Sequence, residues 1–191
     1  ISIHPSLPVH SIAELVQLAK RKPGEVRYGS VGAGSSSHLA TELFRVTAGI
    51  DMVHVPYKGG PQVLQDVISG QIEMTSLPLN ESMPQVRAKR VRALAQTGAR
   101  RSSIAPDLPT MEEAGFKGYA VSTWYVIIGP AAVPSEVVNR LNEEIVKVLK
   151  FPDVQERLKA AGVGDIVGST PAEAAQFLKA EYAKWSKLIQ A

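Results

Sequence analysis

No cysteine occurs among the 191 residues, and this absence removes several classes of protein at once. A disulfide-stabilised scaffold, a cysteine nucleophile and a thiolate metal site are all excluded. The sequence also lacks any run of about 18 apolar residues, so it contains no candidate membrane span. Hydrophobic residues make up 45% of the chain and charged residues 20%, which is enough apolar material for a folded core.

A strong charge of one sign is lacking as well, because the formal net charge is only +3. This value is far below that of a dense phosphate-binding surface, although it suits a small anionic ligand. One basic cluster lacks interleaved aromatic residues and is typical of a solvated face; it comprises Arg87, Lys89, Arg90, Arg92, Arg100 and Arg101. We therefore expect no nucleic-acid partner.

The histidines show no spacing that is typical of metal ligands. His4, His10 and His54 are scattered along the chain, without a second histidine or a carboxylate at a suitable distance. We therefore expect neither a metal ion nor a cofactor.

In the first hundred residues, short strands alternate with helices. The predicted strands are 1–3, 26–28, 52–55, 72–76 and 91–96, and the predicted helices are 12–22, 36–48, 62–69 and 81–88. Ser11 is a good N-cap for the first helix, while Gly49 and Gly70 end the second and third. This order is typical of an α/β fold with a mostly parallel sheet and helices on both faces.

The pattern changes after residue 100. Residues 100–118 are rich in turn formers around a short predicted helix, and an apolar strand is predicted at 121–128. Trp124 and Tyr125 on that strand favour a place in the core, with a hinge as the alternative. Helices are predicted at 135–149, 152–161 and 171–189, and the short helix lies at 110–114. The helix-rich tail indicates a lobe that differs from the first hundred residues.

The strongest chemical signal is the segment 28–39, YGSVGAGSSSHL. A strand runs into three glycines, and three serines then begin a helix. Glycine permits turns with positive φ, and a helix start offers unpaired N–H donors with a partial positive charge. The segment suits a carboxylate or a phosphate, although a plain strand-to-helix turn with serine caps remains an alternative.

Enzyme versions of this loop fit poorly. A P-loop needs Gly-Lys-Ser/Thr, the dinucleotide spacing fails because Ser37 stands where its third glycine would be, and no G-x-S-x-G elbow is present. Ser37 and His38 suggest a nucleophile and a base, but no nearby carboxylate completes a triad. His38 is therefore interpreted as a structural residue or a ligand contact.

A second loop, residues 55–60 (VPYKGG), also lies between a predicted strand and a helix. In open α/β sheets, ligands bind outside the carboxyl ends of the strands. Tyr57 and Lys58 are thus candidates to border the same cleft, and a tight turn with a surface lysine is the alternative.

Several segments in order resemble the Bug receptors, the extracytoplasmic solute-binding proteins of tripartite tricarboxylate transporters (TctC-like proteins). The segments that carry the resemblance are 28–39 (YGSVGAGSSSHL), 54–59 (HVPYKG), 91–95 (VRALA), 106–110 (PDLPT) and 113–115 (EAG). The resemblance runs from Ile1 to Ala191, and the ordered set is far more specific than any one motif.

The resemblance implies a periplasmic-binding-protein type II-like (venus flytrap) fold and a periplasmic, non-enzymatic receptor for small organic carboxylates. It implies that backbone N–H groups, hydroxyls and ordered waters hold the carboxylate. The residues expected to present these donors are Ser30, Val31, Gly32, Gly34, Ser35, Ser36 and Ser37. His38 and Tyr57 are expected to line the cleft. Thr123 and Trp124 are expected to lie at the crossing between lobes, with Thr123 as a further ligand contact. Membrane transporter subunits are the implied protein partners.

Two departures from the family pattern qualify this expectation. Family members carry a further segment before the position of Ile1, so residues 1–122 are expected to form the complete second lobe and residues 123–191 only part of the first. Apolar helix faces without their sheet favour self-association or disorder of the tail.

In addition, many members carry an Asp after the strand at 72–75 where this chain has Ser76-Leu77-Pro78, which disfavours amino-acid ligands.

Two alternatives from other classes stay open. One is an acyl- or phosphoryl-transfer enzyme that uses Ser37 and His38. The other is a truncated structural domain that keeps the fold and binds nothing.

Overall fold

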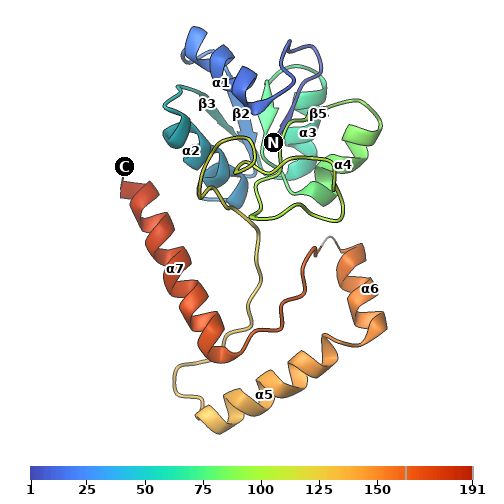
Figure 1. Ribbon diagram of the computed structural model, residues 1–191, viewed down its shortest axis with the longest axis vertical. Helices are drawn as coiled ribbons and strands as arrows, with labels where there is room; N and C mark the ends of the chain where they lie inside the picture. The colour runs from blue at the N-terminus through green and yellow to red at the C-terminus, as the bar shows by residue number, and fades with distance from the viewer. Residues whose placement is uncertain (162, 191) are drawn as a thin grey trace. The chain divides into compact units, whose positions relative to one another are not determined.

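The computed structural model describes residues 1–161 and 163–190 (Figure 1). The chain divides into two compact units, Ile1–Thr123 and Trp124–Ala191. The division lies one residue from the boundary that we expected from the sequence. The assignment of the two parts to lobes of a receptor stays a prediction.

Unit 1 is built on a five-stranded sheet in the order β3-β2-β4-β1-β5. The strands are β1 (Ser2–Ile3), β2 (Arg27–Ser30), β3 (Val53–Pro56), β4 (Met74–Thr75) and β5 (Arg92–Ala93). β2 pairs in parallel with both β3 and β4, as the alternating pattern predicts. β1 departs from that pattern because it runs antiparallel to its neighbours β4 and β5. The sheet is therefore mixed.

Four helices connect these strands, and their ends follow the local signals in the sequence. They are α1 (Ile12–Arg21), α2 (Ser36–Ala48), α3 (Gly60–Ile68) and α4 (Leu79–Arg87). The Ser11 hydroxyl caps α1 by accepting from the Glu14 amide, and Gly49 ends α2 in the left-handed conformation.

Helices α2 and α3 lie on opposite faces of the sheet. The side chain of Tyr28 in β2 reaches Glu42 of α2, whereas a Cβ at the next residue, Gly29, would meet Val63 of α3. Because successive strand residues point to opposite faces, the two helices cover different sides. The chain thus leaves neighbouring strands β2 and β4 toward opposite faces, which is the arrangement that creates a ligand crevice in open α/β sheets.

Each face has its own apolar core. On the α3 side, α3 and α4 enclose a cluster of Val63, Leu64, Val67, Ile72, Leu77 and Val91. On the α2 side, Phe44 meets Phe116 edge to face at 5.4 Å, and the Tyr119 hydroxyl donates to the Ala40 carbonyl at 2.6 Å. The segment that follows β5 therefore packs against α2.

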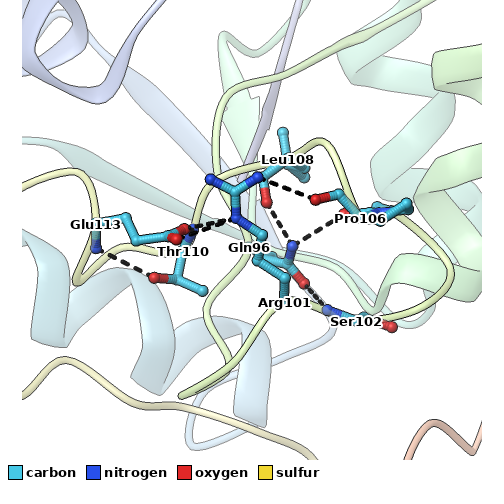
Figure 2. A network of polar contacts seen from close by, with 8 residues as sticks. Gln96, Arg101, Ser102, Pro106, Leu108, Thr110 and Glu113 are labelled. Carbon is cyan, nitrogen blue, oxygen red and sulfur yellow. Dashed lines mark hydrogen bonds and ion pairs between the residues drawn. The ribbon is translucent and has the colours of Figure 1, made fainter.

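That segment is held by the buried side chain of Gln96 (Figure 2). Its amide nitrogen donates to the carbonyls of Ala105 and Leu108, at 3.1 and 2.5 Å, and its oxygen accepts from the Ser102 amide at 2.7 Å. Thr110 and Glu113 bond each other's backbone amides, as at a helix start. The helix predicted at 110–114 is nevertheless wrong, because these residues form a bridge and turns.

Unit 2 contains α5 (Ser135–Val148), α6 (Pro152–Ala160) and α7 (Pro171–Gln190), close to the predicted helices. The strand predicted at 121–128 is absent, since none of these residues is in a strand, although the Val121 amide donates to the Thr97 carbonyl at 2.7 Å. Trp124 is 39% and Tyr125 82% exposed, so their expected place in the core is also wrong. An apolar segment becomes a buried strand only when neighbouring strands cover it.

Within unit 2, Trp124 is anchored to α7. Its ring meets Phe177 edge to face at 5.5 Å, and its indole N–H donates to Glu181 at 3.2 Å. No helix within the described ranges is long and apolar enough to cross a membrane.

Candidate functional site

The carboxyl ends of β2, β3 and β4 lie at one edge of the sheet. Ser30 is in register with Pro56 and Gly29 with Thr75, and the Tyr57 amide donates to the Ser30 carbonyl at 2.9 Å. Helices α2, α3 and α4 begin just beyond these strand ends. The two loops singled out in the sequence therefore lie side by side.

The loop between β2 and α2 depends on two glycines with positive φ. Gly32 has φ of 119° and Gly34 has φ of 77°, values that L side chains rarely adopt. A Cβ at Gly34 would meet no atom within 4 Å, so the backbone conformation and not the space requires glycine there.

Four amides of this loop are bonded to protein atoms. The Val31 amide donates to Ser37 Oγ, the Gly32 amide to Ser30 Oγ, the Gly34 amide to His38 Nδ1 and the Ser35 amide to the Gly32 carbonyl, each at 3.2 Å. The expectation that all of them are unpaired donors is therefore wrong. Short polar side chains next to a turn satisfy such amides because they reach them without leaving the loop.

Three amides of this loop have no hydrogen-bond partner among the described residues, and of the residues that carry them Ala33 and Ser36 are exposed whereas Ser37 is buried. Within the described ranges, no hydrogen bond involves the N–H groups of Ala33, Ser36 or Ser37, whereas Ser35 Oγ accepts from the His38 amide at 3.3 Å. The first amides of any helix lack intrahelical partners and carry the positive end of its dipole. An anion beside Ala33 and Ser36, both of which are exposed, would meet these donors.

Beneath this loop, one tyrosine and two histidines form a stack. The ring centroids of Tyr28 and His54 are 5.0 Å apart, and those of His38 and His54 are 4.1 Å apart. Ser30 Oγ lies 2.7 Å from His54 Nε2, which ties β2 to β3. The stack supports the loop from the α2 side of the sheet.

Glu42 and Arg45 form an ion pair on α2 beside the Tyr28 hydroxyl. The Tyr28 hydroxyl donates to Glu42 at 2.5 Å, and the Arg45 guanidinium binds the same carboxylate at 2.8 Å. Burial alone would raise the pKa of Glu42, but the hydrogen bonds from Arg45 and Tyr28 hold it below its usual value. Burial and the bond to Glu42 raise the pKa of Tyr28, so its phenol stays protonated. Burial also lowers the pKa of His54, and the neighbouring His38 lowers it further.

The remaining predicted residues have different surroundings. Tyr57 packs on the α3 side and donates to Asp66 at 2.7 Å; burial and that bond raise the pKa of Tyr57 to about 12. Lys58 is exposed at the start of the second loop. Thr123 is exposed and is the last residue of unit 1.

The side chains do not assemble the catalytic pair proposed as an alternative. Ser37 Oγ accepts from the Val31 amide and lies 3.1 Å from Ser35 Oγ, while His38 Nδ1 accepts from Gly34. The pair that does meet, Ser30 and His54, was missed in the sequence. Its only signal was that both residues lie on short neighbouring strands. No group of three or more histidine, aspartate or glutamate side chains in the described parts of the chain is arranged to hold a metal ion.

Comparison with known proteins identifies the family of this chain. Residues 1–191 match the profile described as "Tripartite tricarboxylate transporter family receptor" (TctC). The chain belongs to this receptor family. A relative from Pseudomonas sp. strain P51, the UPF0065 protein in the tcbD-tcbE intergenic region, is 37% identical over 179 residues. The alignment covers 93% of this chain and 53% of that protein.

A second relative is protein BugT of Bordetella pertussis, which is 28% identical over 187 residues, or 98% of this chain and 57% of BugT. The chain thus spans little more than half the length of these curated relatives.

Two solved structures share the fold. R. palustris Rpa4515 with adipate matches with a TM-score of 0.83 and 35% identity, over 99% of this chain and 63% of that one. The periplasmic binding protein BugD matches with a TM-score of 0.77 and 27% identity, over 99% and 64%. The α/β architecture of periplasmic binding proteins is therefore that of this chain.

Proposed function

We propose that this chain is part of a periplasmic receptor that captures a small organic carboxylate for a tripartite tricarboxylate-type transporter, without catalysing a reaction. One observation supports this most directly: the unpaired amides of Ala33, Ser36 and Ser37 at the amino end of α2. Membership of the TctC family and the adipate in a neighbour of 35% identity support the ligand class.

In this proposal the residues of the loop divide into two groups. Ala33, Ser36 and Ser37 bind the carboxylate through N–H groups, and Ser36 adds an exposed hydroxyl. The others shape the loop through the hydrogen bonds described above: Ser30, Val31, Gly32, Gly34 and Ser35. His38 and Tyr57 flank the bound group, and Thr123 is retained as a ligand contact on family resemblance alone.

The chemistry of this site favours a carboxylate that is bound without a cationic clamp. N–H donors at a helix start are fixed in direction and need no reorganisation when an anion arrives. Waters can bridge the remaining oxygens at little cost in free energy. The net charge of +3 gives weak long-range attraction, so affinity depends on these local donors.

Position 36 allows a sharp test. Proline is tolerated at the first residue of a helix, and Ser35 already has the extended conformation that proline requires before it, with φ of −67° and ψ of 161°. Ser36→Pro therefore removes one N–H and the hydroxyl, whereas Ser36→Ala removes the hydroxyl alone. We expect Ser36→Pro to weaken binding about tenfold, with Ser36→Ala much closer to the wild type.

Calorimetry measures this difference. It titrates the full-length protein with adipate and with dicarboxylates of other lengths. Unfolding curves of both variants control for stability. Equal affinity of wild type and Ser36→Pro would remove the α2 amides from the site, and conversion of any ligand to product would contradict the non-enzymatic assignment.

Self-association through unit 2 also stays a proposal. Large apolar side chains are exposed on it, including Tyr125, Ile127 and Ile128 at about four-fifths exposure. Light scattering on the 191-residue chain tests this, and a compact monomer would contradict it.

A further inference from the structure

The carboxylate of Glu81, in the first turn of α4, lies against the first residue of α3. A Cβ on Gly60 would collide with Glu81 Oε2 and lie 3.0 Å from its Cδ. Gly60 does not have a positive φ, so the close approach of Glu81, and not the backbone conformation, requires glycine there. Together the two residues fix the position of a negative charge beside the start of α3.

This carboxylate lacks a partner of opposite charge. In the part of the chain that the structure describes, no hydrogen bond and no ion pair involves the Glu81 side chain, although it is only partly exposed. Burial raises the pKa of Glu81, as expected of a carboxylate without a neighbouring cation. Two helix starts make its charge tolerable: Glu81 lies in the first turn of α4, and the N-cap of α3, Gly59, has no side chain of its own.

Glu81 belongs to the same edge of the sheet as the glycine-rich loop. The second loop touches that loop, since the Tyr57 amide donates to the Ser30 carbonyl at 2.9 Å and a Cβ on Gly32 would lie 3.9 Å from the Tyr57 carbonyl oxygen. Gly60 follows Tyr57 by three residues, so their Cα atoms lie within about 11 Å of each other. A ligand flanked by Tyr57 is therefore within electrostatic range of Glu81, because a half-buried charge is screened less than an exposed one.

We propose that Glu81 determines which group the ligand carries near its anchored carboxylate: a second anionic group is rejected, and a neutral hydrogen-bond donor is accepted. This inference rests on the proposed function, because Glu81 acts on a ligand that the α2 amides hold. A second anion close to the first meets a negative charge that no cation balances. A hydroxyl or an amide N–H instead provides the donor that the carboxylate lacks. Adipate separates its carboxylates by four methylene groups, so it can place the second one away from Glu81.

The test compares two ligands of nearly equal size, succinate and its half-amide succinamate, in which a carboxamide replaces one carboxylate. Calorimetry with the full-length protein at about pH 8, where carboxyl groups are ionised, gives the ratio of their affinities. In Glu81→Gln this ratio is expected to shift toward succinate by roughly three- to tenfold, because the repulsion is removed. Gly60→Ala displaces the carboxylate without removing it, and we expect a smaller shift in the same direction.

Glu112→Gln is the matched control. It removes an equal charge from an exposed residue of unit 1, and the ratio is expected to stay that of the wild type. Salt provides a second readout, because the ratio in the wild type is expected to move toward succinate between about 0.05 M and about 0.5 M salt, while Glu81→Gln changes little. A purely steric role of Glu81 would show no such dependence.

The outcomes separate this inference from the proposed function. An unchanged ratio in Glu81→Gln, or an equal shift in Glu112→Gln, overturns the role of Glu81 alone. Binding of adipate without binding of either four-carbon ligand in both proteins does the same. If the wild type binds no carboxylate at all, the proposed function fails together with this inference.

Discussion

Ser30 Oγ lies 2.7 Å from Nε2 of His54, and this contact joins two neighbouring parallel strands directly beneath the glycine-rich loop. The same hydroxyl also donates to the Gly32 carbonyl and accepts from the Gly32 amide. The fully buried side chain of Ser30 therefore determines both the contact with His54 and the first turn of the loop.

Replacement of this hydroxyl is expected to destabilise unit 1. Ser30→Ala leaves the half-buried Gly32 amide without its acceptor and His54 without its partner, at a cost of about 1–3 kcal/mol in the free energy of unfolding. Urea denaturation followed by circular dichroism measures the change. Ser36→Ala, at an exposed serine of the same loop, is the matched control and is expected to change stability by less than about 0.5 kcal/mol. Equal stability of the two variants would contradict the role of Ser30.

The lowered pKa of His54 predicts a loss of stability in mild acid. The unfolded chain binds a proton at His54 below about pH 6.5, whereas the folded chain resists it, so stability falls as the pH drops from that value toward the lower folded pKa. Denaturation midpoints across this interval measure the effect. His54→Gln removes the titration and flattens this part of the profile, while His10→Gln leaves it unchanged.

Glu42 predicts a separate loss at lower pH. Its folded pKa lies below the unfolded value, so the stabilisation is present above about pH 4.3 and is lost as the pH falls below it. Glu42→Gln is expected to reduce the acid sensitivity in this lower interval while the loss near neutrality persists. Loss of the same part of the pH profile in His54→Gln and in Glu42→Gln would contradict separate contributions from His54 and Glu42.

The positive φ of Gly34 predicts a penalty for any side chain there. Gly34→Ala forces an L residue into the left-handed region at a cost of about 1–2 kcal/mol, although nothing obstructs its Cβ. Asparagine tolerates that region better, so Gly34→Asn is expected to lose less. Thermal unfolding compares the two, and an equal loss would show that the side chain meets an obstacle.

Gln96 is expected to be the strongest polar anchor of the segment after β5 (Figure 2). Gln96→Ala leaves the Leu108 carbonyl and the Ser102 amide without partners, while the Ala105 carbonyl keeps its bond from the Leu108 amide, and we expect a loss of about 2–4 kcal/mol. Gln17→Ala, on the exposed face of α1, is the control and is expected to be nearly neutral. A small loss at Gln96 would show that water replaces its hydrogen bonds.

The sequence by itself determined the order of strands and helices in the first hundred residues, the glycines of the loop and the caps of α1 and α2. These depend on residues within a few positions of one another: Ser11 caps the amide of Glu14, and the positive φ of Gly34 depends on that residue being glycine. The family could also be identified from the sequence, since its motifs are short and occur in a fixed order. For the same local reason, the position of the glycine-rich loop between β2 and α2 could be predicted.

Only the tertiary structure decided which groups of that loop are free. Ser30 meets His54 across 24 residues because β2 and β3 pair in parallel, and the Gly34 amide is satisfied by a histidine that α2 turns back toward it. The antiparallel course of β1 and the exposure of Tyr125 likewise depend on which strands find neighbours. Hydrogen bonds and burial between distant segments depend on their arrangement in space, which local pattern does not contain.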